Sequence, residues 1–415
     1  MKKFTDPSQD NGNPRSWRIT VAVMFTAQFL SGVGFSFVLP FFPFYFRFLG
    51  VDNESDILLW MGWSSLAFGI TMTFSAPLWG LVADRYGRKL MVIRSMLAGS
   101  IILGLMGLAT NPWHLLILRI CQGAATGTVA ASVTLVSSIT PSANLGISLG
   151  LMQTALFLGA ATGPLFGGVL AEHYGFRLPC GLAFIILFFG TILVFLGARE
   201  RFVPPRKSKT TGITTIKNII HTAGFKTILL IFFFIYVLRM MITPILPLYI
   251  EMLSGKSSGA VSLTGIFVGI TALLMGISSF VLGRLGDILG HERILILSLI
   301  MSGIFSIPQS FANSITVLFI EMCLLGLVFG GLITSVNTLV SNMISKEKIG
   351  SAYGLTGSVT CLGIGMGPFI GGTIASVIGL RWPFAIMGIT AFMMAVFVWK
   401  TLHKRVIRSS VPEKN

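Results

Sequence analysis

Long apolar stretches separated by short polar ones follow one another from Trp17 to Leu402. Most contain about 18 residues or more, which lets a helix cross a hydrocarbon core of about 30 Å. Backbone polar groups find no water in lipid, so each of these stretches must be helical. The pattern predicts twelve membrane spans. They are 17–46, 58–82, 90–109, 112–138, 145–171, 178–198, 226–251, 262–284, 292–312, 314–342, 347–376 and 381–402.

The composition supports an all-α membrane protein. Of the 415 residues, 53% are hydrophobic and 11% are charged, whereas soluble domains contain roughly 25% charged residues. The first apolar stretch has no small-residue cleavage site after it, so we expect an uncleaved span rather than a signal peptide. The four cysteines show no paired spacing, and we expect free thiols and no metal or cofactor. They are Cys121, Cys180, Cys323 and Cys361.

The net charge of +16 is explained by topology. If both termini lie on one side, that side receives 24 of the 30 Lys and Arg residues. Translocated loops avoid Lys and Arg, so the sequence predicts cytoplasmic termini, a prokaryotic plasma membrane and no nucleic-acid partner. The exceptions are Arg47, Arg177, Lys256 and Arg381 on the other side, and Arg119 and Arg239 inside spans.

The chain also repeats itself at a shift of about 203 positions. The matches are Pro40 with Pro244, Pro43 with Pro247, Gly80–Gly87 with Gly283–Gly290, and Gly163–Gly168 with Gly367–Gly372. We therefore expect a cytoplasmic tail (1–16), a six-helix bundle (17–198), a basic linker (199–225), a second six-helix bundle (226–402) and a tail (403–415). Transporters built from parallel repeats bind solute between the halves near midplane.

Three motifs lie in or beside the first-half spans. They are Gly80-Leu81-Val82-Ala83-Asp84-Arg85-Tyr86-Gly87-Arg88-Lys89, Arg119-Ile120-Cys121-Gln122-Gly123 and Gly159-Ala160-Ala161-Thr162-Gly163-Pro164-Leu165-Phe166-Gly167-Gly168. In the first, glycines permit a tight turn, and a carboxylate is favoured at a helix N-terminus. In the second, an Arg inside the bilayer needs a cavity or a partner. In the third, small residues permit close helix packing and Pro bends the helix.

With these motifs the chain resembles the major facilitator superfamily, and within it the twelve-span drug:proton antiporter branch. The resemblance implies that Asp84 and Arg88 latch the cytoplasmic side shut, with Gly80, Arg85 and Gly87 completing the motif. It implies a part in proton coupling for Arg119. It also implies that the Gly-Pro motif marks exporters, through Gly159, Gly163, Pro164, Gly167 and Gly168.

Each motif also has a plainer explanation. The basic residues of the first motif could simply anchor the chain on the cytoplasmic side, and its second-half copy around Asp287 lacks the basic tail. Arg119 could be a structural hydrogen-bonding centre. The glycines of the third motif could serve only close packing, although packing alone does not require the Gly-Pro placement.

Three strongly ionised side chains lie well inside spans: Arg119, Arg239 and Glu321. Their spans are the fourth, seventh and tenth, which the resemblance places around the central cavity. Glu321 is the only carboxylate well inside a span and is our first candidate for the carried proton, with Asp84 second. Alternatively, Glu321 pairs permanently with an Arg or extends to the outer interface.

Two Arg against one Glu leave the predicted cavity neutral or positive. We therefore expect a neutral or anionic amphipathic solute, such as a drug, carried by a monomer through alternating access. The cavity candidates are Gln28, Phe35, Arg119, Gln122, Gln153, Arg239, Glu321 and Asn337.

Other functions stay open at this stage. An uptake symporter of the same fold would share the first motif, and a lipid or glycolipid flippase is a variant of export. An enzyme is disfavoured because the five His residues lie in loops or at span edges without nucleophile or ligand spacing. A sensor would need an appended soluble domain, and neither the tail nor the linker is expected to form one. Transport driven by ATP would need a nucleotide-binding Gly-x-x-x-x-Gly-Lys-Ser/Thr loop, which the sequence lacks.

Overall fold

The computed structural model describes residues 15–125, 127–141, 144–200, 202, 224–256, 259–344 and 349–409. Nearly all of the predicted N-terminal tail and linker, and the end of the C-terminal tail, lie outside these residues. The side chain of Asp84 also lies outside the described part, although its backbone belongs to a helix.

The described residues form helices and no strands, with 12 helical segments long and apolar enough to span a membrane, so the predicted all-α class and number of spans are confirmed. In the first half the elements are α1 (Arg15–Ser36), η2 (Leu39–Phe41), α2 (Phe42–Phe48), α3 (Glu54–Tyr86), α4 (Arg88–Met106), α5 (Pro112–Ala125), α6 (Thr128–Ile139), α7 (Leu145–Tyr174) and α8 (Arg177–Gly197). In the second half they are α10 (Phe225–Met241), α11 (Leu246–Ser254), α12 (Ala260–Leu289), α13 (His291–Gln309), α14 (Ile315–Met343), α15 (Ile349–Ile378) and α16 (Trp382–Ser409).

Three spans that the hydropathy pattern predicts as continuous are broken. The first span breaks after Ser36, and the seventh breaks between Met241 and Leu246. Both breaks lie beside the repeated prolines, which lack an N–H and therefore kink or break a helix. The fourth span breaks between α5 and α6 beside Gly127, whose φ of 141° favours glycine.

The repeat extends to side-chain contacts. The Tyr45 hydroxyl donates to the Met106 carbonyl at 2.6 Å, and the Tyr249 hydroxyl donates to the Gln309 carbonyl at 2.8 Å. Each bond ties the outer part of a broken span to the end of the third helix of its half. The same bond at equivalent positions shows that both halves fold around the same local constraint.

Glycines spaced four residues apart on α7 and on α15 make equivalent contacts in the two halves. A Cβ added at Gly159, Gly163 or Gly167 would lie 2.0–2.7 Å from a backbone oxygen, or in one case from the Ser36 hydroxyl, of the first span. Equivalent glycines of α15 meet the seventh span in the same way, and they are Gly363, Gly367 and Gly371. Each half therefore depends on glycine to bring its fifth helix against its broken first helix.

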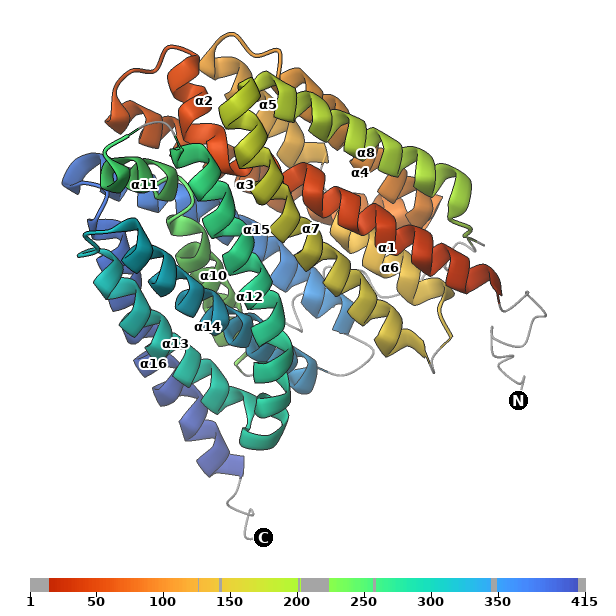
Figure 1. Ribbon diagram of the computed structural model, residues 1–415. Helices are drawn as coiled ribbons and strands as arrows, with labels where there is room; N and C mark the ends of the chain where they lie inside the picture. The colour runs from red at the N-terminus through yellow and green to blue at the C-terminus, as the bar shows by residue number, and fades with distance from the viewer. Residues whose placement is uncertain are drawn as a thin grey trace, which may run out of the picture.

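The two halves meet along α3 with α15 and along α7 with α12 (Figure 1). We call the side where the chain termini lie the termini side, and the opposite side, with α2 and α11, the far side. Gly62, Gly69, Gly168, Gly265 and Gly372 contact the other half from the far side to mid-depth.

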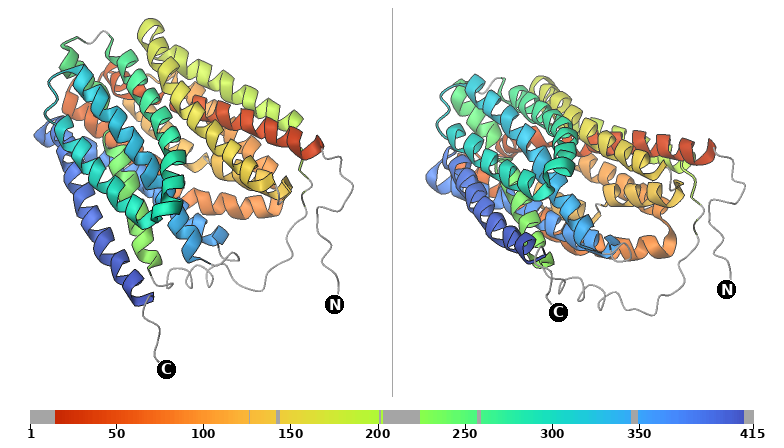
Figure 2. Two further views of the ribbon diagram at one scale, coloured as in Figure 1. Left: turned by 60° about the horizontal axis from the view of Figure 1, so that its bottom comes forward. Right: turned by 90° about the horizontal axis from the view of Figure 1, so that it is seen from below.

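Among the residues that the structure describes, the contacts between the halves cease toward the termini side. An added Cβ would meet nothing within 4 Å at Gly80, Gly146, Gly150, Gly354 or Gly357. The two bundles diverge toward the chain ends (Figures 1 and 2). The halves are therefore closed against each other on the far side and separated on the termini side.

Candidate functional site

Arg119 of α5 is buried, with 8% of its surface exposed. Its Nη1 donates to Gln122 Oε1 at 2.8 Å, one helical turn away. Its guanidinium carbon lies 4.7 Å from the ring centre of Phe42 and 5.1 Å from that of Phe68. These contacts place the cation between α2 and α3 inside the first half, and the cation–π contacts offset part of the cost of burying it.

Glu321 of α14 occupies the matching position in the second half, one to two turns from the start of its helix. It is half-buried, and its Oε2 is shielded from solvent without a hydrogen-bond partner. Among the described residues Glu321 has no ion-pair partner, so the permanent Arg pair left open by the sequence is not formed here.

The remaining cavity candidates separate into different environments. Arg239 of α10 is half-buried and interacts with Tyr236, one turn earlier. Gln28 of α1 is fully buried, and neither atom of its amide has a hydrogen-bond partner. Gln153 of α7 is exposed. Phe35 lies against Gly99 of α4, inside the first half.

Asn337 of α14 is engaged within the second half. Its side-chain NH2 donates to the Ile333 carbonyl at 2.8 Å, and its backbone carbonyl accepts from the Tyr353 hydroxyl at 3.2 Å. The candidates therefore do not form one cluster. Among them, the amide of Gln28, Nε of Arg119 and Oε2 of Glu321 are buried polar atoms without a hydrogen-bond partner.

The 80–89 motif covers the last turns of α3, the connection at Gly87 and the start of α4. Gly87 has a φ of 98°, which favours glycine. The carboxylate at the N-terminus of α4 belongs to Glu200, which accepts from the backbone N–H groups of Arg88 at 3.0 Å and Lys89 at 2.8 Å. Negative charge is favoured there by the unpaired N–H groups and the helix dipole.

Other members of this motif and its copy lie at the surface. The Arg85 guanidinium lies 5.4 Å from the ring centre of Tyr86, and Gly80 is open to space. In the second half, Oδ1 of Asp287 lies 3.1 Å from Nε2 of His291, across the turn between α12 and α13. None of these described side chains contacts the other half, in agreement with the separation on the termini side.

The Gly-Pro motif of α7 faces two neighbours at once. Gly159, Gly163 and Gly167 pack against the first span, as described above. Gly168 instead faces the other half, where an added Cβ would lie 2.7 Å from the Val261 carbonyl of α12. The paired glycines therefore serve both the packing within the first half and the closure between the halves.

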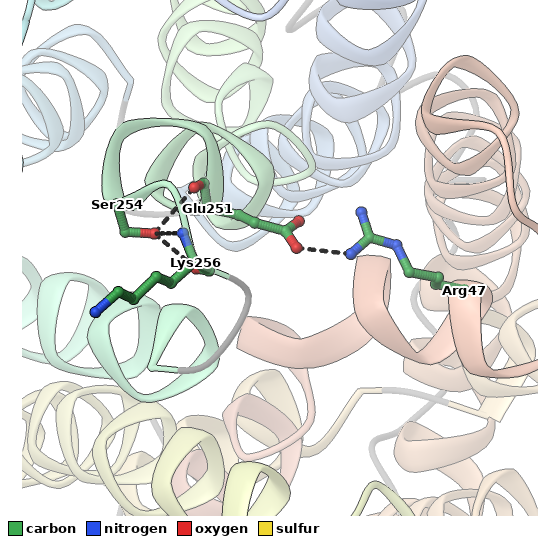
Figure 3. Close-up of polar contacts among 4 residues, drawn as sticks. All are labelled: Arg47, Glu251, Ser254 and Lys256. Atoms are coloured by element: carbon green, nitrogen blue, oxygen red, sulfur yellow. Dashed lines mark hydrogen bonds and ion pairs between the residues drawn. The ribbon is translucent and has the colours of Figure 1, made fainter.

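Sequence reasoning missed two contacts that join the halves on the far side. Arg47 Nη1 of α2 lies 2.8 Å from Glu251 Oε1 of α11 (Figure 3). Glu172 of α7 accepts from the backbone N–H of Gly259, and also from that of Ser262 at 2.9 Å, at the N-terminus of α12. The repeat itself was a usable signal for the first contact, because Arg47 and Glu251 are 204 positions apart.

This arrangement of two repeated bundles with broken first helices is that of a membrane transporter. The family model of the Major Facilitator Superfamily matches residues 24–278 and 228–415. The chain belongs to the Major Facilitator Superfamily.

Two curated relatives are similar along nearly their whole length. Multidrug resistance protein MdtG of Salmonella newport (strain SL254) is 33% identical over 398 residues, covering 94% of this chain and 97% of that protein. The protein of the same name from Salmonella paratyphi C (strain RKS4594) is 34% identical over 399 residues with the same coverage.

Solved structures share the fold at low identity. The human organic anion transporter MFSD10 (TETRAN) gives a TM-score of 0.71 at 15% identity, covering 93% of this chain and 100% of that chain. A mutant of the nucleoside transporter NupG gives 0.76 at 13%, covering 93% and 99%. A bacterial homologue of the human lysosomal transporter Spinster gives 0.74 at 16%, covering 95% and 99%.

Proposed function

We propose that this protein is a proton-coupled exporter of small, neutral or anionic amphipathic compounds such as drugs. It lies in the plasma membrane of a prokaryote with both termini cytoplasmic, and it works as a monomer by alternating access. The names of the MdtG relatives, which are multidrug resistance proteins, support both the solute class and the direction.

The basic residues support the orientation. Of the 30 Lys and Arg residues, 24 fall on the termini side in the twelve-span topology, and Lys and Arg concentrate on the cytoplasmic side of membrane proteins. The far side is then the outer side. With this orientation, we infer that a closed far side and a separated termini side, in the part of the chain described, represent the inward-facing state.

The observation that carries proton coupling is the unpaired carboxylate of Glu321. A charged carboxylate inside a membrane span is costly unless it is paired, and Glu321 Oε2 is shielded without a partner in the described structure. Binding a proton removes this cost. A carboxyl that is neutral in one state and ionised in another can exchange one proton for one solute.

Arg119 has a different role in the first half. Its guanidinium donates to Gln122 and lies over two aromatic rings, so it holds a fixed positive charge in the outer part of that half. We propose that it, together with Arg239, biases the solute toward neutral and anionic compounds. Asp84 remains the second candidate for proton coupling and, with Arg88, for the cytoplasmic latch.

The driving force is sufficient for export. One proton moving through 100 mV releases about 2.3 kcal/mol. At about 1.4 kcal/mol for each tenfold ratio, this supports a gradient of roughly fortyfold for a neutral solute.

The test measures proton movement caused by solute. Proteoliposomes containing a trapped pH indicator are given a gradient of a neutral lipophilic dye with no imposed pH gradient. Antiport predicts that protons move opposite to the dye and change the internal pH. A protonophore should collapse this pH change. Proton flux in the same direction as the dye would instead identify a symporter, and dye flux without proton flux would contradict coupling. A permanent cation preferred over a neutral analogue would contradict the proposed solute charge.

A further inference from the structure

We propose that Arg47, Glu251 and Glu172 form the outer gate of the transport cycle, two electrostatic contacts that hold the far side closed and break when it opens. The proposal requires only that the chain alternates between two states, and it is independent of proton coupling and of the identity of the solute.

The first contact lies close to the symmetry axis between the halves. Arg47 and Glu251 are equivalent residues of α2 and α11, and equivalent positions meet each other only where a pseudo-twofold axis passes between them. Their Nη1 and Oε1 atoms are 2.8 Å apart, with 36% of the Arg47 side chain and 16% of the Glu251 side chain exposed. In Figure 3 the two groups face each other across the halves, whereas the Lys256 ammonium points away.

The second contact is a helix cap supplied by the other half. The helix α12 starts after Gly259, and its first N–H groups have no partner within the helix. Glu172 Oε1 accepts from the Gly259 N–H, and Oε2 accepts from the Ser262 N–H at 2.9 Å. Glu172 lies in the last turn of α7. This helix runs antiparallel to α12 along the interface, so any separation of the two helices on the far side breaks both bonds.

The last turn of α7 therefore lies beside the N-terminus of α12. In this structure the α7–α12 contact is formed on the far side, while the described part of the termini side is separated.

The expected effects follow from the kind of bond. A cap or a partly exposed ion pair is a modest interaction, so removing either contact should raise the ratio of far-side-open to far-side-closed molecules by about threefold to tenfold. The two contacts lie on different helices, so their effects should multiply when both are removed.

The test measures the distance between the halves on the far side. Spin labels are attached through bio-orthogonal amino acids at Asn111 and Asn313, two exposed and equivalent positions; this route leaves the four native cysteines in place. Distance distributions are recorded in lipid nanodiscs for the wild type, Arg47→Gln, Glu172→Gln and both together. Glu172→Gln replaces one accepting oxygen with an NH2 group that faces an N–H donor.

Matched controls remove a charge on the same side at residues that make no hydrogen bond or ion pair to the other half within the described part of the chain. They are Lys256→Gln for Arg47→Gln, and Glu54→Gln for Glu172→Gln; both control side chains are exposed. We expect a larger fraction of long distances in the gate variants and no change in the controls. Equal distributions in gate and control variants would overturn the proposal.

A charge exchange separates a gate from a general loss of stability. Arg47→Glu alone places two carboxylates face to face and should open the far side, whereas Arg47→Glu with Glu251→Arg should restore the wild-type distribution, because the two positions are equivalent. An exchanged variant that resembles the single reversal would contradict the ion pair as a gate. If the wild type showed no solute-driven proton flux while the gate variants still changed the far-side distances, the proposed function would be contradicted and the gate would not.

Discussion

Adding one methyl group at Gly167 or at Gly168 should have two different consequences, although the two residues are neighbours on α7. At Gly167 the new Cβ would lie 2.0 Å from the Phe37 carbonyl oxygen in the same half. At Gly168 it would lie 2.7 Å from the Val261 carbonyl oxygen in the other half. The first substitution strains the packing of a bundle, and the second strains the closure between bundles.

The size of the first effect follows from the geometry. Real Cβ contacts essentially never fall below 3.0 Å, so α7 and the first span must separate by about 1 Å. Overpacking of this kind costs about 1–3 kcal/mol. In a unit of 150–250 residues each kcal/mol lowers the Tm by about 2–4 °C. We therefore expect Gly167→Ala to lower the Tm by about 5 °C.

The assay is thermal unfolding in detergent together with the far-side label distances. Gly167→Ala should lower the Tm, while Gly168→Ala should mainly increase the far-side-open fraction. Gly150→Ala on the same helix is the control, because nothing lies within 4 Å of its added Cβ and Ala favours helix over Gly. Equal Tm values for Gly167→Ala and Gly150→Ala would refute the packing argument.

Three further predictions concern contacts within each half, and Tm measurements check each of them. Glu200→Gln removes the charge at the N-terminus of α4 and should cost about 1 kcal/mol, with an effect that shrinks at high salt; an unchanged Tm would contradict the capping role. Tyr45→Phe and Tyr249→Phe should each cost about 1 kcal/mol and add in the double variant, whereas unequal effects would argue against equivalent constraints in the halves. Arg119→Lys loses the planar group between two rings and should cost about 1 kcal/mol. In combination with Phe68→Leu it should cost less than the sum, and strict additivity would argue against that contact.

The hydropathy pattern was sufficient to predict the number and order of the spans, because each must be apolar for about 20 residues whatever its neighbours are. The Arg119–Gln122 bond was also accessible, since residues three apart share a helix face. The breaks in the first, fourth and seventh spans were not predicted. Apolar side chains continue through the breaks in the first and seventh spans, and hydropathy does not register the missing N–H of a proline. In the fourth span hydropathy does not register the φ of Gly127.

Contacts between distant segments were beyond the sequence argument. The carboxylate at the N-terminus of α4 is that of Glu200, more than 100 positions along the chain from Arg88 and Lys89, and the sequence argument did not anticipate this contact. Arg47 and Glu251 were placed at equivalent positions by the repeat. Their meeting depends on their distance from the axis between the halves, which a linear pattern does not contain.

The most direct test of proton-coupled export is dye efflux from proteoliposomes with and without an imposed pH gradient, for the wild type, Glu321→Gln and the control Glu54→Gln. The account predicts gradient-driven efflux in the wild type and in the control, and its loss in Glu321→Gln with dye binding retained. Gradient-driven efflux that survives in Glu321→Gln would contradict the assignment of the proton to Glu321. Wild-type efflux that does not respond to the gradient would contradict proton coupling itself.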